Sequence, residues 1–445
     1  MRSWDWEKSR MIMNHDEKVT RIAEALKRRP NGRPVSLKKK AVSHQVPKRQ
    51  DAQRMDDKID ISDLNEVLSI DPETKICTAE PGVTFADLLD TTLQYGLVPI
   101  IVPELKTITI GGAVSGCSVE SASFRYGGFH DTCLEYEVIT AEGEIIECRP
   151  DDRNGLIYQM IHGSFGTLGI LSKLTFRLVE AKSYVRLEYE RYEKMANYTA
   201  AIYDRFKRGS DDFIDGIIHG DDHFTLCIGT FTGVAPYTNR YTWLKPFYKS
   251  TRELDEDYME TRDYFFRYDS DCHWIARNYG LENPVLRFLV GKFFLSSSRM
   301  LSLARSYPNI FNRGRPQVVL DVFVPFNRVE DFLRFYIDEM DYYPLWVVPY
   351  KLVRPYEWLN PEYVDDELFV DFAVYGMKPA DETDYYRLIE EKLLEIKGIK
   401  TLISHNSYTP EEFWRVWNKE NYDKVKRRTD PRNIFRNIYE KTHSA

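Results

Sequence analysis

The chain of 445 residues lacks the features that mark several large protein classes. It contains no run of about 18 apolar residues, which is the length that a membrane-spanning helix needs. Its six cysteines form no C-x-x-C pair and no cysteine–histidine cluster with zinc-ligand spacing, so we expect neither a metal site nor a disulfide framework. The net charge of -8 argues against a protein whose main partner is a nucleic acid.

A secretory leader is not expected either, because residues 1–29 contain no apolar segment of signal-peptide length. We therefore expect reduced thiols in a cytoplasmic protein. A chain without a spanning helix can still act on membrane lipid by docking to the surface, so peripheral contact with a membrane stays open.

The residues that are present indicate a folded chain with more than one domain. Apolar residues make up 43% of the chain and charged residues 29%, as in ordinary globular proteins. At roughly 100–200 residues per domain, the length predicts two or three domains. Aromatic residues reach 14%, which is typical of well-packed cores and also of sites for large, flat or greasy molecules, and composition does not choose between the two.

Helical and strand-like patterns alternate irregularly along the chain, which predicts an α+β fold. Before residue 182 we expect helices at 16–29 and, capped by Thr84, at 85–93, and strands at 135–140, 144–148 and 171–178. After residue 184 a second α+β region with an antiparallel sheet is expected. It comprises strands at 214–219, 224–229, 317–325, 345–349, 368–373 and 400–404 and helices at 197–208, 329–340 and 381–396.

The most informative stretch is PELKTITIGGAVSGCS, residues 103–118. It interleaves glycines with small hydroxyl residues: Gly111, Gly112 and Gly116 with Thr109, Ser115 and Ser118. Glycine allows the backbone to approach a ligand closely, and exposed backbone N–H groups with hydroxyls form a nest for a pyrophosphate. A glycine-rich turn without a ligand is the alternative. The chain has no G-x-G-x-x-G fingerprint and no P-loop pattern, which excludes those two nucleotide-binding motifs.

Three further small-residue elements lie in the same region, so coincidence is a weaker explanation. They are PGV at 81–83, RYGG at 125–128 and HGSFGTLGI at 162–170. In this order, PGVTFADL, PELKTITIGGAVSGCS, FRYGG and HGSFGTLGI resemble the FAD-binding domain of the vanillyl-alcohol oxidase / p-cresol methylhydroxylase (PCMH-type) superfamily. The stretch KVKRRTDPRNIF at 424–435 is similar to the closing K…DP…F element of that superfamily.

A narrower resemblance covers nearly the whole chain, from about residue 15 onward. The segments at 103–138, 283–294 (NPVLRFLVGKFF), 343–350 (YPLWVVPY) and 411–414 (EEFW) are similar to the Δ24-sterol reductase (Diminuto/Dwarf1-like) family. This resemblance implies a two-domain PCMH-type FAD-binding fold with a second α+β substrate (cap) domain on an antiparallel sheet. The implied units are an FAD-binding domain at 15–182, a substrate domain at 183–405 and a segment at 406–445 that returns to the FAD domain.

The resemblance also implies which residues contact FAD. They are Pro81, Gly82, Val83, Thr109, Ile110, Gly111, Gly112, Ser115, Gly116, Ser118, Ser123, Tyr126, Gly127, Gly163, Gly166, Thr167, Gly169 and Ile170. Residues 36–45 depart from the superfamily, because they contain no glycine, and we expect non-covalent FAD rather than a bond to His44. Lys38, Lys39 and Lys40 either attract the pyrophosphate or are simply solvated.

The implied activity is an FAD-dependent reduction of a carbon–carbon double bond in a lipid-like small molecule, with NADPH as the electron donor. The lipid is a sterol side chain or an unsaturated or methylene fatty acyl chain. An isolated double bond also needs a proton donor, and the candidates are Tyr408, His405 and Glu120, each of which has a purely structural alternative. An FAD-dependent alcohol or hydroxy-acid oxidase or dehydrogenase is the alternative function, and a flavin-free binding protein on the same fold is a third.

Overall fold

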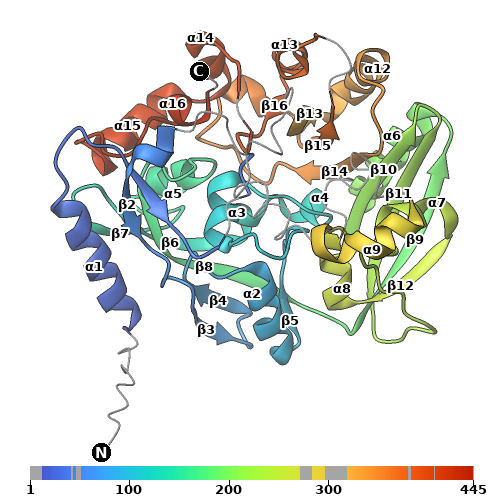
Figure 1. Ribbon diagram of the computed structural model, residues 1–445, viewed down its shortest axis with the longest axis horizontal. Coiled ribbons are helices and arrows are strands. Elements are labelled where there is room, and N and C mark those ends of the chain that lie inside the picture. Colours follow the sequence, from blue (N-terminus) through green and yellow to red (C-terminus); the bar gives the residue numbers. More distant parts are fainter. Residues whose placement is uncertain are drawn as a thin grey trace, which may run out of the picture.

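The computed structural model describes residues 13–41, 44–46, 52–270, 283–295, 318–378, 382–404 and 406–443. Within them the chain forms two large antiparallel sheets with helices around them, together with a small parallel pair of strands (Figure 1). The expected combination of helices with antiparallel sheets is therefore confirmed.

The first sheet has six strands in the order β3–β4–β8–β6–β7, and β5 pairs with β8. Its strands are β3 (Val67–Asp71), β4 (Ile76–Ala79), β5 (Leu97–Pro99), β6 (Cys133–Ile139), β7 (Ile145–Cys148) and β8 (Ile170–Glu180). Its neighbouring helices are α2 (Phe85–Thr92), α3 (Ile110–Gly116), α4 (Ser123–Tyr126) and α5 (Gly155–Ile161). Alternate side chains of β8, among them Leu174, Phe176 and Leu178, are buried, as expected for a strand with one face on a core.

The second sheet has eight strands in the order β12–β9–β11–β10–β14–β15–β13–β16, and all its neighbours are antiparallel. Its strands are β9 (Tyr184–Tyr192), β10 (Phe213–Gly220), β11 (His223–Thr232), β12 (Glu256–Glu260), β13 (Val318–Pro325), β14 (Leu345–Lys351), β15 (Leu368–Met377) and β16 (Ile399–Lys400). The chain passes from the first sheet to the second between Glu180 and Tyr184.

The two faces of the second sheet have different partners. On one face, Val322, Phe372 and their strand neighbours form a core with α6 (Met195–Arg208), α12 (Val329–Glu339) and α13 (Tyr385–Ile396). On the other face, residues such as Trp346 and Ala373 belong to the same buried apolar cluster as the first sheet. Helices α7 (Phe247–Glu253), α8 (Thr261–Phe265) and α9 (Pro284–Phe294) lie near the β9–β12 end (Figure 1). The inner face of the second sheet is thus turned toward the first sheet.

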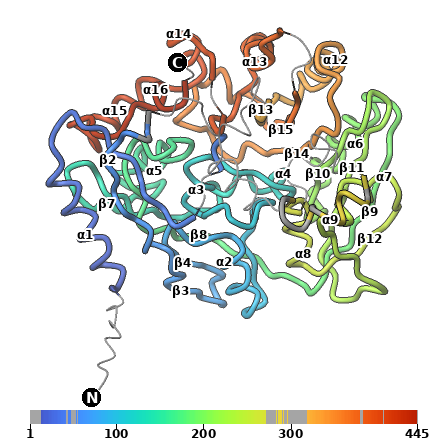
Figure 2. The backbone as a smooth tube through the Cα atoms, in the orientation of Figure 1, coloured from blue at the N-terminus to red at the C-terminus, as the bar shows by residue number. Residues whose placement is uncertain are grey.

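The two ends of the chain meet beside the first sheet. Near the N-terminus lie α1 (His15–Lys27) and the parallel strands β1 (Val35–Lys38) and β2 (Asp57–Asp60); near the C-terminus lie α14 (Pro410–Val416), α15 (Lys419–Thr429) and α16 (Ile438–Thr442). The Val35 backbone N–H donates to the carbonyl of Ile434 at 2.8 Å, and Arg432 donates to the carbonyl of Arg29 at 2.8 Å. Figure 2 shows these blue and red segments together.

A helix long and apolar enough to cross a membrane does not occur in the part of the chain that the structure describes.

Candidate active site

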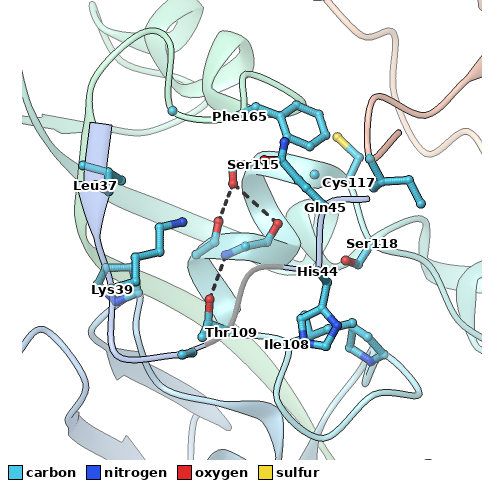
Figure 3. Close-up of a pocket in the computed structure, with 18 of the residues that line it drawn as sticks. Leu37, Lys39, His44, Gln45, Ile108, Thr109, Ser115, Cys117, Ser118 and Phe165 are labelled. Carbon is cyan, nitrogen blue, oxygen red and sulfur yellow. Dashed lines mark hydrogen bonds between the residues drawn. The ribbon is translucent and has the colours of Figure 1, made fainter. Parts of the chain in front are cut away.

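A cavity of about 600 Å³ lies where the glycine-rich segment meets the second sheet, a volume typical of sites for small molecules and cofactors. Its lining comes from widely separated parts of the chain: β1 and the residues after it, the segment leading into α3, the loop before β8, strands β13, β14 and β15, and Lys441 near the C-terminus. Figure 3 shows part of this lining, with Lys39, Thr109, Ser115 and Phe165 around α3. The cavity therefore joins the two halves of the molecule.

The glycine-rich segment is a short helix rather than the open loop that its composition predicts. Thr109 caps α3 by accepting a hydrogen bond from the Gly112 N–H at 3.2 Å, and the Ser115 hydroxyl donates to the Gly111 carbonyl at 2.8 Å (Figure 3). Ile110 and Ala113 are buried at helical spacing, and this burial explains why a glycine-rich sequence folds as a helix here.

The glycines of the site do different things. A Cβ at Gly111 would lie 2.5 Å from the Cβ of Pro81, and one at Gly82 would lie 2.3 Å from the carbonyl oxygen of Leu64. These two glycines allow chain segments to pack closely. Gly166 has a φ of +72° and no atom within 4 Å of the position of a Cβ, so here the missing side chain leaves open space.

Many, but not all, of the residues predicted to contact FAD line the cavity. Those that do are Pro81, Gly82, Thr109, Gly111, Gly112, Ser115, Gly116, Ser118, Gly166 and Gly169. Those outside its lining are Val83, Ile110, Ser123, Tyr126, Gly127, Gly163, Thr167 and Ile170. Some of the latter support the site: Ile110 donates its N–H to the Val83 carbonyl at 3.0 Å, and the Ser123 hydroxyl accepts from the Glu120 N–H at 3.0 Å.

One wall of the cavity is basic. We define the basic wall as Lys38, Lys39, Lys40 and Lys58, all of which are exposed and line the cavity. Lys38 pairs with Asp60 at 2.6 Å. His44 also lines the cavity, and its Nε2 lies 2.9 Å from the Thr107 hydroxyl. Clustered ammonium groups attract phosphate groups, and hydroxyls bind them.

A second wall carries an acidic cluster, defined as Glu104, Asp321 and Asp371, which the sequence analysis did not single out. Asp321 lies opposite Ala373 in the β13–β15 ladder and Asp371 lies opposite Phe323, so the two aspartates are diagonal neighbours on one face. The Tyr375 hydroxyl donates to Asp321 Oδ1 at 2.5 Å.

The environment raises the pKa values of the three carboxyl groups in this cluster. Burial raises the pKa of Asp371 well above its usual range, and the negative charges of Asp321 and Glu104 act in the same direction. Burial likewise raises the pKa of Glu104, with the charges of Glu120 and Asp321 adding to the effect and that of Arg267 opposing it. Burial also raises the pKa of Asp321. Carboxylic acids that stay neutral near pH 7 can act as proton donors.

The signal that points to this cluster is present in the sequence. The strands read VVLDVFVP and LFVDFAVYGM, and each places one aspartate in the middle of an apolar run. Burying a charge without a partner costs free energy, so an aspartate in an apolar strand indicates a specific structural or functional role.

Of the three predicted proton donors, Glu120 lies near the cavity but does not line it. Its Oε1 accepts a hydrogen bond from Arg267 at 2.9 Å, and Arg267 also donates to Asp215 at 2.9 Å. Burial raises the pKa of Glu120, whereas the Arg267 charge lowers it. Since the Trp346 indole also donates to Asp215, this buried network connects the segment after α3 to β10 and β14.

Neither of the other two predicted proton donors is placed at the cavity by the structure. Tyr408 is fully buried, 6.0 Å from Trp417 between ring centroids, and lies outside the cavity lining. Its backbone carbonyl accepts a hydrogen bond from the Tyr439 hydroxyl at 3.0 Å. His405 lies outside the described residues.

The C-terminal segment holds the loop that lines the cavity before β8. The Lys426 ammonium donates to the Thr167 carbonyl at 2.9 Å, to Asp430 at 2.7 Å and to the Phe435 carbonyl at 2.6 Å. Lys441 donates to the Phe165 carbonyl at 2.6 Å. The stretch that resembles a closing K…DP…F element therefore acts as a brace for this loop.

Comparisons with known proteins agree with this site. The family model described as "FAD binding domain" matches residues 42–149. The Delta(24)-sterol reductase of Homo sapiens is 25% identical over an alignment of 398 positions that covers 86% of this chain and 77% of that protein. The Delta(24)-sterol reductase of Arabidopsis thaliana is 25% identical over an alignment of 479 positions, gaps included, that covers 96% of this chain and 84% of that protein.

A third relative matches a shorter part of the chain. Cytokinin dehydrogenase 3 of Oryza sativa subsp. japonica is 29% identical over 118 residues, 26% of this chain and 22% of that protein. The resemblance drawn from the motifs, to PCMH-type FAD domains and to sterol reductases, is thereby confirmed.

Proposed function

Starting from an FAD-dependent oxidoreductase whose relatives include Delta(24)-sterol reductases, we propose that this protein reduces a carbon–carbon double bond of a lipid, with NADPH as the electron donor. The lipid is a sterol side chain or an unsaturated or methylene fatty acyl chain. The observation that carries the proposal is the cavity, which brings together basic and hydroxyl groups suited to a phosphate and a buried acid on an apolar sheet.

The residues present fit FAD. The basic wall and the hydroxyls of Thr109 and Ser118 are the donor set that a pyrophosphate requires, and the space beside Gly166 is one that a Cβ would fill. The chemistry that FAD supplies when bound is the transfer of a hydride. The contact of His44 with Thr107 supports non-covalent binding, because it engages one of the two nitrogens of that ring.

The proposed functional division of the chain follows the two sheets. Residues 15–182 bind FAD, residues 183–405 cover it with the substrate side, and residues 406–445 return to the FAD side. The change of sheet between Glu180 and Tyr184 supports the first boundary. The contacts of Lys426 and Lys441 with the loop before β8 support the return.

The substrate side of the cavity favours a lipid. Apolar and aromatic side chains from the second sheet line it, among them Val319, Phe323, Trp346 and Tyr375. Oxidation of an alcohol, the alternative function, needs a base, whereas neutral carboxyl groups donate protons. The raised pKa values of the acidic cluster therefore favour reduction. We also propose a cytoplasmic protein in peripheral contact with a membrane, where such a substrate resides.

The test begins with the visible absorption spectrum of the purified protein under anaerobic conditions. We expect a flavin spectrum that NADPH bleaches and that an added lipid restores, with a mass gain of two hydrogens in the lipid. Flavin that is bleached by alcohols or hydroxy acids but not by NADPH would instead establish the alternative function. A protein that stays colourless after FAD is added would exclude both.

A further inference from the structure

The acidic cluster contains one side chain placed to react. Asp371 is 2% exposed, lines the cavity, and its Oδ1 has no hydrogen-bond partner among the described residues. Buried polar atoms are almost always paired, so an unpaired oxygen at a cavity wall points to a group that binds there. The apolar neighbours Phe323 and Trp346 line the same space.

The groups that face Asp371 hold it in place without sharing its free oxygen. Asp321 on β13 is engaged by the Tyr375 hydroxyl, and Glu104 faces the cluster from the segment before α3. Arg267, whose charge acts on Glu104, donates to Glu120 and Asp215 rather than to Asp371. Asp371 thus lies among like charges, which disfavour its ionisation.

We propose that Asp371 is the catalytic acid that donates the proton completing the reduction of the double bond, and that Glu104 and Asp321 keep this proton in place. The inference rests on the proposed function. One alkene carbon receives the hydride that FAD carries from NADPH. The other forms its C–H bond as the Asp371 O–H bond breaks, and the π electrons of the alkene become that bond. The Asp371 carboxylate then takes a proton from water.

The sheet geometry explains why Asp371, and neither Glu120 nor Tyr408, has this role. Both of the latter lie outside the cavity lining, and Glu120 is bound to Arg267. Asp371 lies in the middle of β15, between β14 and β13, where Val348 and Phe323 are its partners in the ladder. A central strand of a paired sheet fixes a side chain more firmly than a loop does, as a proton donor requires.

The first test separates the two half-reactions in the variant Asp371→Asn. Bleaching of the flavin by NADPH is expected at the wild-type rate, because no substrate proton is involved. Reoxidation by the lipid is expected to slow by about 10²–10⁴-fold, the usual contribution of a general acid. Asp371→Glu, which restores a carboxyl group, should recover part of the rate. The matched control is Asp257→Asn, a fully buried carboxyl on β12 of the same sheet that does not line the cavity.

The second test needs no turnover. The infrared spectrum of the FAD-loaded protein at pH 7 should contain the C=O stretch of a protonated carboxyl group, and Asp371→Asn should weaken this band whereas Asp257→Asn leaves it unchanged. Absence of such a band, or wild-type reoxidation in Asp371→Asn, overturns this proposal while the proposed function stands. Failure of the unaltered protein to reduce any lipid overturns the function and the proton transfer together.

Discussion

The basic wall and the acidic cluster line the same cavity, yet the charged groups of the first are exposed to solvent and the carboxyl groups of the second are largely buried. The lysines of the basic wall are exposed, so their charges remain solvated. Glu104 and Asp371 are 9% and 2% exposed, and their burial opposes ionisation. The difference teaches that two walls of one cavity can suit opposite tasks, and it supports our proposal that one attracts an anion and the other holds a transferable proton.

The largest expected effect comes from disturbing α3, several residues of which line the cavity shared by the two walls. Gly111→Ala places a Cβ 2.5 Å from that of Pro81 and 3.0 Å from the Pro81 carbonyl oxygen, so backbone must move. We expect a loss of about 1–3 kcal/mol in the free energy of unfolding, as for other overpacked sites, and purification without FAD. Thermal unfolding and the flavin absorbance per mole of protein measure these effects.

The control for this variant is Gly233→Ala, because a Cβ at Gly233 meets no atom within 4 Å. Equal FAD content in the two variants would contradict the role assigned to the α3 segment.

A smaller effect is expected from changing the electrostatics of the acidic cluster alone. Asp321→Asn removes a negative neighbour of Asp371, so the pKa of Asp371 should fall. Because the acid must be protonated to donate, the rate of flavin reoxidation decreases as pH rises through that pKa. The descending limb of the pH profile should therefore move to lower pH, by about one unit. A limb that moves to higher pH, or that also moves in Asp257→Asn, would contradict the argument.

The smallest effect is expected at the basic wall. The triple variant Lys38→Gln, Lys39→Gln, Lys40→Gln should retain FAD about tenfold less tightly at low salt, because exposed charges contribute little each. The difference from wild type should shrink as salt is added. With FAD in excess, the rate of reoxidation should be unchanged. FAD titrations at two salt concentrations measure this effect. A reduced rate of reoxidation at saturating FAD would contradict the assignment of the basic wall to FAD binding alone.

Local patterns in the sequence predict much of the fold. The helix expected at 16–29 is α1 (His15–Lys27), and the helix capped by Thr84 is α2 (Phe85–Thr92). The strand expected at 317–325 is β13 (Val318–Pro325), because an almost continuous run of apolar residues predicts a buried strand. Boundaries shift where the strand is buried on both faces: 368–373 extends to Met377 because every residue of β15 is buried.

The parts that sequence does not predict depend on distant contacts. Residues 67–71 form β3, a strand that the sequence analysis did not predict and that pairs with β4. The glycine-rich segment folds as α3 because its apolar side chains are buried by the first sheet's core. The acidic cluster gathers residues from positions 104, 321 and 371, and no local pattern brings them together. The glycine and hydroxyl residues of the segment at 103–118, in contrast, could be predicted as part of a site because they are contiguous in the sequence.

The brace formed by Lys426 and Lys441 has a consequence for biosynthesis. During translation, both sheets and the glycine-rich segment leave the ribosome before the two lysines that fix the loop carrying Phe165 and Thr167. A nascent chain halted at residue 404 therefore contains every described strand but lacks the two lysines that hold this loop of the cavity lining. We expect the cavity to be completed only after the C-terminal segment has been synthesised.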